Sequence, residues 1–416
     1  MSYLPRIVDA ELAARLDATG AVVVEGPKAC GKTETARQIA SSEVLLDVDE
    51  NARQAVAVDP RLVLAGDTPR LIDEWQIEPA VWNHIRREVD ARSAPGQFIL
   101  TGSAVPADDV TRHTGAGRIT RLRMRPMSLF ESGRSTGAVS VAELLTGRSA
   151  QVPDPGLTIP DLAREISIGG WPGLRELPVE SALRAVRGYL DEIRRVDIDR
   201  VDGARRDPEK VQRLLRSLAR HVATHASITT LAADAGGPEG PLKRDTVSDY
   251  LNALARLMVV EDQPAWAPHL RSRAPLRKAA KRHFVDPSLA VAALVATPEG
   301  LLSDLNLLGL LFESLVVRDL RVYAQAADAE VFQHRNGNGL EVDAIVRSAD
   351  GRWAAFEVKL GPGQVDEGAA NLKRFAGLLD TDGGDGPAAL AVVTGFGYGY
   401  VRDDGVVVVP IGALGP

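Results

Sequence analysis

The sequence contains very little cysteine: Cys30 is the only one in 416 residues. An intramolecular disulfide is therefore impossible, and we expect a cytoplasmic protein from a reducing compartment. Positive charge is not in excess either, because 49 Lys and Arg residues stand against 56 Asp and Glu residues, giving a net charge of −7. A protein that is basic throughout is excluded, so any contact with nucleic acid has to come from local patches.

Long uninterrupted apolar runs are also absent. Arg6 and Asp9 break the first apolar residues, so no signal peptide is expected there. The most apolar later run, 301–317, contains Asp304 and Glu313, which is typical of a buried amphipathic helix and not of a membrane span. The composition, 45% hydrophobic and 25% charged, is that of a globular protein, and this length predicts two to four domains.

The clearest motif is a phosphate-binding loop near the N-terminus. An apolar strand, 21–25, leads into a segment that fits the Walker A pattern G-x-x-x-x-G-K-[ST], and a helical pattern follows it. The segment reads Gly26-Pro27-Lys28-Ala29-Cys30-Gly31-Lys32-Thr33, with Glu34 next. Its glycines let successive backbone N–H groups point inward at phosphates, Lys32 neutralises charge on the β- and γ-phosphates, and Thr33 offers a hydroxyl to Mg²⁺. We therefore predict that residues 26–34 bind ATP or ADP with Mg²⁺.

Two adjacent carboxylates follow a later apolar strand. The run 69–72 ends in Asp73 and Glu74, an arrangement that holds Mg²⁺ through its water shell and polarises an attacking water. We assign Asp73 to the metal and Glu74, as a catalytic residue, to the water.

The strand predicted for 97–103 carries Thr101 and Ser103 at its carboxyl end. Ligands meet an open parallel sheet at this edge. Two interpretations stay open: a contact with the γ-phosphate, or a hydroxyl that caps the next element.

Arg118 follows a Gly-Ala-Gly turn and is a candidate arginine finger. It would act on ATP in its own chain or, in a homo-oligomer, on the ATP of a neighbour. The next three arginines alternate with apolar residues, which indicates a strand with one solvated basic face: they are Arg121, Arg123 and Arg125.

These features together resemble the widespread bacterial and archaeal AAA+-like ATP-binding proteins that carry a C-terminal domain of unknown function. The segments with the resemblance are Tyr3-Leu-Pro-Arg-Ile7, the phosphate loop, Leu71-Ile-Asp-Glu-Trp-Gln76, Leu100-Thr-Gly-Ser103, Gly115-Ala-Gly-Arg118 and Arg125-Pro-Met-Ser-Leu129. The resemblance implies ATP hydrolysis, a winged-helix segment and a nuclease-like C-terminal fold, without a known substrate. Trp75 departs from the family, in which a small aliphatic residue is more usual.

The middle of the chain is expected to be helical. Residues 135–161 are rich in glycine, proline and small residues and predict a flexible linker. Farther on, three short helices and a strand between 210 and 260 predict a winged helix-turn-helix. The outer face of its third helix either contacts DNA or couples domains; that face carries Arg244, Ser248, Asn252 and Arg256.

The most basic stretch is 266–282, with six cations and no acid. Its charge suits the phosphates of DNA or RNA, and Trp266 supplies a possible stacking face. The alternative is a solvated loop, or a cradle for acidic residues elsewhere in this acidic chain.

The C-terminal part combines a helix carrying Glu313, a strand carrying Asp343 and a strand carrying Glu357 and Lys359. This order is similar to that of the PD-(D/E)XK nucleases. In that interpretation Glu313, Asp343 and Glu357 hold one or two Mg²⁺ ions, while Lys359 orients or activates the attacking water. The same scaffold also occurs in forms that only bind.

We therefore predict a multi-domain α/β protein. Its expected parts are an AAA+-like P-loop ATPase domain with a parallel sheet (1–134), a linker and helical lid (135–200), a winged helix with a basic connector (201–300) and an α/β PD-(D/E)XK nuclease-like domain (301–416). The expected function is Mg²⁺-dependent ATP hydrolysis that gates an action on nucleic acid. The alternative is a nucleotide-dependent switch that binds a protein partner, with an inactive nuclease-like scaffold. A small-nucleotide kinase is disfavoured, because the sequence has no recognisable acceptor site.

Overall fold

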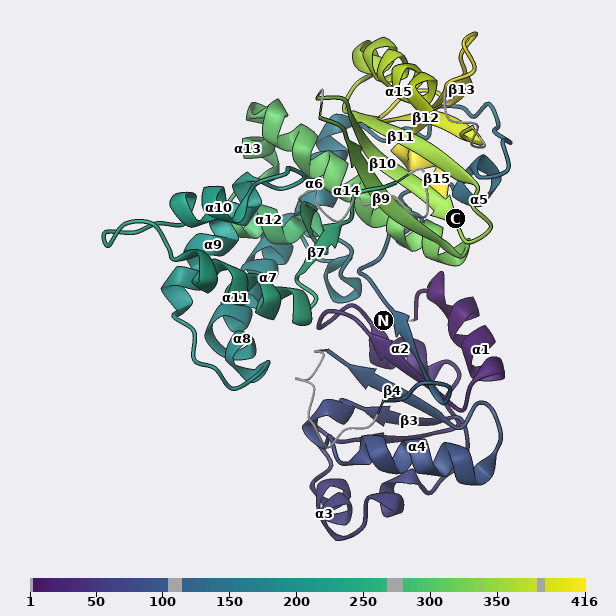
Figure 1. Ribbon diagram of the computed structural model, residues 1–416, viewed down its shortest axis with the longest axis vertical. Helices are drawn as coiled ribbons and strands as arrows, with labels where there is room; N and C mark the ends of the chain where they lie inside the picture. The colour runs from purple at the N-terminus through teal and green to yellow at the C-terminus, as the bar shows by residue number, and fades with distance from the viewer. Residues whose placement is uncertain (1–2, 104–113, 268–279, 338, 380–385) are drawn as a thin grey trace.

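A computed structural model describes residues 3–103, 114–267, 280–337, 339–379 and 386–416 (Figure 1). The N-terminal part is built on a five-stranded parallel sheet with the strand order β2-β3-β4-β1-β5. Its strands are β1 (Ala21–Glu25), β2 (Ser42–Leu45), β3 (Arg70–Asp73), β4 (Phe98–Gly102) and β5 (Ile119–Arg123). The predicted parallel sheet is therefore present.

Both faces of this sheet are covered by helices, because its central strands are apolar on both sides. Val22 and Val24 of β1 face α1 (Val8–Ala18) and α2 (Lys32–Arg37), whereas Val23 faces α3 (Glu50–Val58) and α4 (Val81–Arg92). Burial on both faces fixes the strand ends, and the phosphate loop leaves the carboxyl end of the central strand β1.

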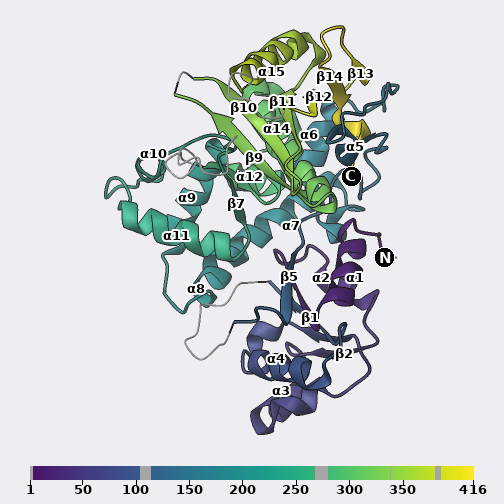
Figure 2. The same cartoon turned by 45° about the vertical axis from the view of Figure 1, so that its right-hand side comes forward.

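The middle of the chain forms a helical layer beside both other parts (Figures 1 and 2). Helix α12 packs on α6, α7 and α9, and α13 packs on α6. The helices are α6 (Ile159–Ile168), α7 (Val179–Glu192), the π-helix η4 (Ile193–Asp197), α8 (Ile198–Arg200), α9 (Pro208–Arg220), α10 (Ile228–Asp234), α11 (Arg244–Arg256), α12 (Pro287–Leu294) and α13 (Pro298–Ser303). Strands β7 (Val260–Gln263) and β8 (Lys281–Phe284) pair antiparallel directly after α11 along the chain.

The C-terminal part is a six-stranded mixed sheet between two helices. Its elements are α14 (Leu305–Ala326), β9 (Ala329–Arg335), β10 (Glu341–Ser348), β11 (Trp353–Lys359), α15 (Val365–Leu379), β12 (Ala389–Thr394), β13 (Tyr400–Val401) and β14 (Val407–Pro410). The strand order is β13-β14-β12-β11-β10-β9, and β11 runs parallel to β12 but antiparallel to β10. The apolar side chains on the two faces of the sheet belong to separate clusters, one with α14 and the other with α15.

The segment expected to be a flexible linker is packed against the C-terminal sheet instead. Strand β6 (Val139–Ser140) pairs with β15 (Leu414–Gly415), and short helix α5 (Val141–Leu144) follows it. The backbones of Val152 and Gly399 exchange two hydrogen bonds of 2.9 and 3.0 Å. Composition indicated a loop correctly, but it could not reveal partners about 250 residues away.

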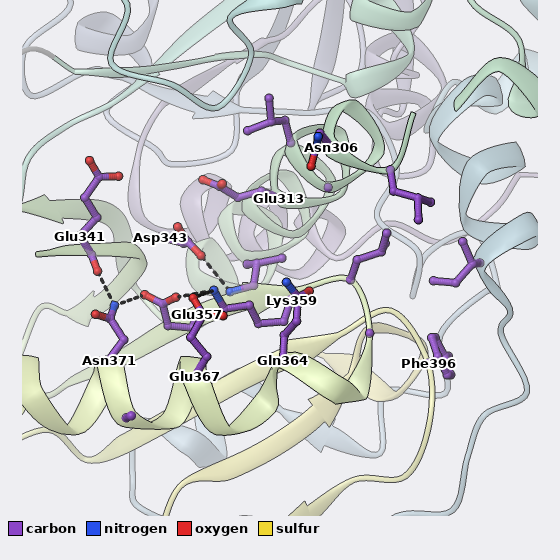
Figure 3. A pocket seen from close by; sticks show the side chains of 18 of the residues that line it. Asn306, Glu313, Glu341, Asp343, Glu357, Lys359, Gln364, Glu367, Asn371 and Phe396 are labelled. Carbon is purple, nitrogen blue, oxygen red and sulfur yellow. Dashed lines mark hydrogen bonds and ion pairs between the residues drawn. The ribbon is translucent and has the colours of Figure 1, made fainter. Parts of the chain in front are cut away.

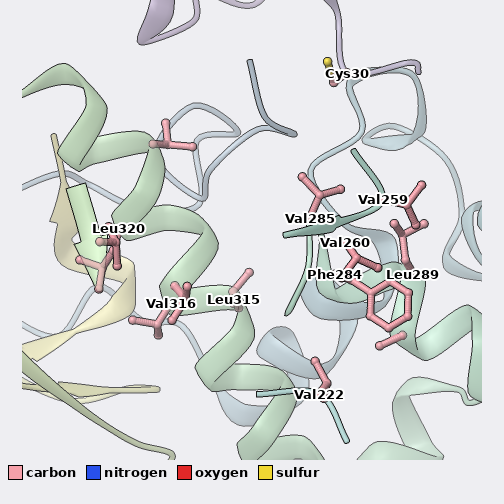
Figure 4. Packing of buried hydrophobic residues seen from close by; sticks show 14 of the residues in the cluster. Cys30, Val222, Val259, Val260, Phe284, Val285, Leu289, Leu315, Val316 and Leu320 are labelled. Carbon is pink, nitrogen blue, oxygen red and sulfur yellow. The ribbon is translucent and has the colours of Figure 1, made fainter. Parts of the chain in front are cut away.

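One of the apolar clusters extends through the N-terminal, middle and C-terminal parts, so that Cys30 beside the phosphate loop belongs to the same cluster as Leu315 and Leu320 of α14 (Figure 4). The Asp319 carboxylate of α14 accepts a 3.0 Å hydrogen bond from the backbone N–H of Leu129. The N-terminal sheet is thus attached directly to the C-terminal part. No helix in the described ranges is both long enough and apolar enough to cross a membrane.

Candidate functional sites

The phosphate loop has the backbone that its glycines predict. Gly31 lies at φ +105°, in the left-handed region, directly before α2 begins. A Cβ at Gly26 would lie 2.3 Å from the carbonyl oxygen of Met124, so a side chain has no room there. The Lys32 ammonium group donates to the Pro27 carbonyl at 2.9 Å, within the loop itself.

Oxygen ligands suited to Mg²⁺ meet beside this loop. The Thr33 hydroxyl donates to Oδ1 of Asp73 at 2.8 Å, and the Thr101 hydroxyl donates to the same oxygen. Hard carboxylate and hydroxyl oxygens at this position fit Mg²⁺ held between protein and phosphates. Thr101 therefore orients Asp73, whereas its contact with the γ-phosphate stays a prediction.

Glu74 follows Asp73, the last residue of β3, and its backbone lies in the left-handed region at φ +51°. Its Oε2 accepts hydrogen bonds from the Ser103 hydroxyl at 3.2 Å and from the side-chain amide of Gln76. Glu74, Gln76 and Ser103 all line the cavity that also contains Lys32. The position of Glu74 suits the assigned role of activating water, and that role remains a prediction.

The nucleotide cavity, about 750 Å³, is closed on one side by the helical middle of the chain. Asp197, Arg200 and Leu257 line it opposite the phosphate loop. Asp197 ends the π-helix η4, and its Oδ1 lies 2.6 Å from the ammonium nitrogen of Lys28 in the loop. Sequence analysis missed Asp197 and Arg200, because no local pattern shows that 197–200 lie opposite a loop about 170 residues earlier.

Arg118 lies at the amino-terminal ends of the parallel strands, whereas the phosphate loop lies at their carboxyl ends. The Arg118 backbone carbonyl accepts from the N–H of Ala21, at the start of β1, whereas the phosphate loop follows the end of that strand. Its guanidinium is exposed and forms a 2.7 Å ion pair with Asp90. The Arg118 side chain therefore lies away from the phosphate loop of its own chain, and its role as an arginine finger stays a prediction.

Arg6, in the segment before α1, is a further residue that sequence analysis did not assign to the site. Its guanidinium donates to the carbonyl oxygens of Cys30 and Arg125, each at 2.8 Å, and forms a 3.0 Å ion pair with Glu131. Both side chains of the ion pair are buried, with exposed fractions of 3% and 1%. Arg6 thus holds the phosphate loop against the segment that leaves β5.

The three arginines in and directly after β5 are engaged by other groups, although the Arg121 side chain remains 43% exposed. Arg121 pairs with Glu25 and lies over the ring of Trp82, and burial lowers the pKa of Arg123. Arg125 donates to Glu261 of β7 at 2.6 Å and to the Gln325 side chain of α14 at 2.9 Å. The strand prediction was correct, but these charges connect parts of the molecule.

The predicted C-terminal residues converge on one cavity of about 1,230 Å³ (Figure 3). Ala344 pairs with Phe356 across β10 and β11, so Asp343 and Glu357 lie at the next position of the register. The Lys359 ammonium lies 3.7 Å from Glu357, and α14 contributes Glu313 to the same cavity. The convergence that strand alternation predicted is therefore present, while the roles of these residues stay predictions.

A lysine that the sequence analysis did not assign to this cluster reaches its carboxylates from β8. The Lys281 ammonium pairs with Glu313 and lies 3.5 Å from Oδ1 of Asp343. Burial raises the pKa of Glu313 to about 8, with Asp343 adding to the shift and Lys281 opposing it. Burial and Asp343 likewise raise the pKa of Glu357 to about 8. Burial acts to lower the pKa of Lys281, but the two carboxylates outweigh it and raise that pKa.

Trp266 and Arg256, two of the residues expected to contact nucleic acid, make internal contacts. Arg244 and Asn252 on the outer face of α11 are exposed, and their contact with DNA stays a prediction. Trp266 is buried 4.9 Å from Trp353, ring centroid to ring centroid, so it cannot stack on a base. On α11, Arg256 donates to the Val201 carbonyl at 2.9 Å, and the neighbouring Asp249 pairs with Arg206. The other cations of the basic stretch, Arg271, Arg273, Arg277 and Lys278, lie outside the described residues.

Three family models match separate parts of the chain. Residues 18–132 match an AAA domain. Residues 159–300 match a domain of unknown function, DUF8612, and residues 308–414 match another, DUF4143. No curated protein sequence matches the chain.

Among solved structures, the Walker-type ATPase PABY2304 of Pyrococcus abyssi is similar over 68% of this chain and 94% of its own. The identity is 13% and the TM-score is 0.42.

The parallel sheet, the phosphate loop and the AAA match support a P-loop ATPase domain in the N-terminal part, and proteins of this class generally use ATP and Mg²⁺. The remainder of the chain carries two domains of unknown function.

Proposed function

We propose that this protein is a nucleotide-dependent switch. In this proposal Mg²⁺-dependent ATP hydrolysis in the N-terminal domain controls how the C-terminal domain binds a protein partner. The observation that carries it is a continuous series of contacts from the phosphate loop to the C-terminal cavity.

The series starts at Arg6, which joins the Cys30 carbonyl to the Arg125 carbonyl. The Arg125 side chain then pairs with Glu261 on β7. Strand β7 pairs with β8, and Lys281 of β8 reaches Glu313 and Asp343. Packed side chains and ion pairs of this kind carry energetic coupling between two sites when they have two alternative arrangements. Exchange of ATP for ADP would shift the equilibrium between these two arrangements.

Charge favours a protein partner over nucleic acid at the C-terminal cavity. Five carboxylates line it, against the two cations Lys359 and Arg374: they are Glu313, Glu341, Asp343, Glu357 and Glu367. Because the pKa values of Glu313 and Glu357 are raised to about 8, the cavity carries its full negative charge only above that pH, where it repels phosphates and suits a basic segment of a protein. The described cations of the basic stretch, Lys281 and Arg282, are engaged with acids inside the molecule.

A second candidate function is an ATP-gated nuclease. The observation that favours it is the convergence of Asp343, Glu357 and Lys359, on elements that follow the order helix, three strands, helix, strand. In this alternative the helices 208–256 with β7 and β8 act as a winged helix, and residues 266–282 contribute to binding DNA or RNA.

One experiment separates the two functions. ATP hydrolysis with Mg²⁺ is measured with and without single- and double-stranded DNA or RNA, and strand cleavage is followed in the same tubes. The proteins are the wild type, Lys32→Ala, Glu74→Gln and Lys359→Ala. The switch predicts hydrolysis that ignores nucleic acid, no cleavage, and loss of hydrolysis in Lys32→Ala and Glu74→Gln only. Stimulation by nucleic acid, together with cleavage that Lys359→Ala abolishes, would establish the nuclease instead.

A further inference from the structure

The hairpin of β7 and β8 is inserted against the C-terminal sheet. The Gln263 side-chain amide donates to the backbone carbonyls of Phe332 and Asp343, both at 2.9 Å. The ring of His283 lies 3.0 Å from the Gln263 side-chain oxygen and 3.2 Å from the Ser314 hydroxyl of α14. These contacts fix β8, and with it Lys281, relative to α14 and β10.

The fixed strand places one ammonium group between two carboxylates. Lys281 meets Glu313 from α14 and Asp343 from β10, and only 4% of its side chain is exposed. Its partners lie 32 and 62 residues away in sequence, on different elements. A buried carboxylate is stable only with a counter-charge or a proton. Lys281 provides the counter-charge for Asp343 and, above the raised pKa of about 8, for Glu313 as well.

The remaining carboxylate oxygens do not fit a resident divalent metal. Oδ2 of Asp343 accepts the backbone N–H of Val358 at 2.9 Å, and Oε1 of Glu357 accepts the Asn371 amide at 2.8 Å. Among the described residues, no group of three or more His, Cys, Asp or Glu side chains is arranged to hold a metal ion. Magnesium needs several oxygens in near-octahedral geometry, and an ammonium group already lies beside two of the three candidate ligands.

We infer that Lys281 is the permanent cation of the Glu313–Asp343 pair and stands where the nuclease interpretation requires a metal. The wild-type C-terminal cluster therefore binds no divalent cation. Removal of the lysine converts the same carboxylates into a divalent-cation site. This inference does not depend on ATP hydrolysis, and it applies to the switch and to the nuclease-like scaffold alike.

The test compares divalent-cation binding by nucleotide-free, full-length proteins. Mn²⁺ is titrated by calorimetry and by electron paramagnetic resonance into wild type, Asp343→Asn and Lys281→Met. We expect Asp343→Asn to leave wild-type Mn²⁺ binding unchanged, because the cluster binds none. We expect Lys281→Met to gain one Mn²⁺ site, and the double variant Lys281→Met/Asp343→Asn to lose it.

Thermal unfolding gives a second readout that does not require a measurable affinity. Lys281→Met leaves buried carboxylates without their cation, so its melting temperature should fall by roughly 5–10 °C, and Mn²⁺ should restore part of that loss. Lys281→Arg keeps a cation and should gain no response to Mn²⁺. Wild-type Mn²⁺ binding that Asp343→Asn abolishes would overturn the inference, as would a Lys281→Met protein that is folded and still takes no Mn²⁺. If Lys281→Met does not fold, the wild-type and Asp343→Asn titrations decide alone.

Discussion

Arg200 and Asp197 are the two charged residues by which the helical middle of the chain reaches the nucleotide cavity. Asp197 is already paired with Lys28 of the loop, whereas the exposed Arg200 side chain faces the same cavity. An arginine beside transferring phosphates stabilises charge that develops in the transition state. Because Arg118 lies at the far edge of the sheet, Arg200 is the better candidate for this task within one chain.

We predict that Arg200→Ala lowers kcat for ATP hydrolysis by roughly 10²–10³-fold, with a smaller change in KM. The same variant should lose affinity for ADP with aluminium fluoride, which imitates the transition state. The matched control is Arg195→Ala, an exposed arginine of η4 that does not line the cavity. Equal activity of Arg200→Ala and wild type would exclude Arg200 from catalysis.

At this scale the sequence is informative where chemistry is local. Gly31 and Lys32 are recognisable because each has a fixed task within a few residues of backbone. Lys281 and Arg6 are not, since their importance comes from partners at least 24 residues away. Arg118 was proposed to act on ATP because it follows a Gly-Ala-Gly turn, whereas the strand direction places it at the other end of β1 from the phosphate loop.

The segment before α1 contains one end of a buried ion pair, between Arg6 and Glu131. Arg6 and Glu131 are both almost fully buried. Removing one partner of such a pair leaves an uncompensated charge.

We predict that Arg6→Ala lowers the free energy of unfolding of the ATPase domain by about 3–5 kcal/mol and weakens ATP binding through the loop. Arg37→Ala, which breaks an ion pair with the exposed Glu43, should cost less than about 1 kcal/mol. Denaturant titration followed by a probe in the ATPase domain measures both. Equal costs would show that burial of the Arg6 pair is irrelevant.

The hairpin of β7 and β8 should carry a pH dependence through His283. Burial, then Arg321 and Lys281, lower the pKa of this ring well below 6.5. Below about pH 6.5, His283 is therefore protonated in the unfolded chain but stays neutral in the folded chain. The free energy of unfolding therefore decreases as the pH falls below that value.

We predict that between pH 7 and pH 5 the wild type loses up to about 1.4 kcal/mol per pH unit through this one group. His283→Gln should show a shallower loss over the same window. Chemical unfolding at a series of pH values measures the difference, and identical slopes for the two proteins would contradict the assignment.

At the scale of the whole molecule, many elements were predictable but their attachment was not. Periodicity and turns located the parallel sheet, the helices 208–256 and the strands β9 to β12 to within a few residues, but not β13 or β14. The pairing of β6 with β15 and the insertion of Trp266 into the C-terminal core join distant segments. No local pattern encodes such pairs, because nothing in the residues around each segment indicates which distant segment it will contact.

These attachments join the parts of the molecule to one another, and the proposed switch would use them to transmit a change. Arg125 connects β5 with β7 and α14, and Lys281 connects β8 with α14 and β10. The proposed switch therefore requires that exchange of the nucleotide at the phosphate loop alters the structure or dynamics of the C-terminal cavity.

Hydrogen–deuterium exchange of full-length Glu74→Gln, with and without Mg²⁺ and ATP, tests this requirement most directly, because this variant is expected to hold ATP without hydrolysing it. The account predicts that ATP changes exchange in β7, β8 and the strands β10 and β11, and that adding Arg125→Ala abolishes the change there while protection of residues 26–34 remains. ATP-dependent changes confined to residues 1–134, with the C-terminal strands unaffected, would contradict the account.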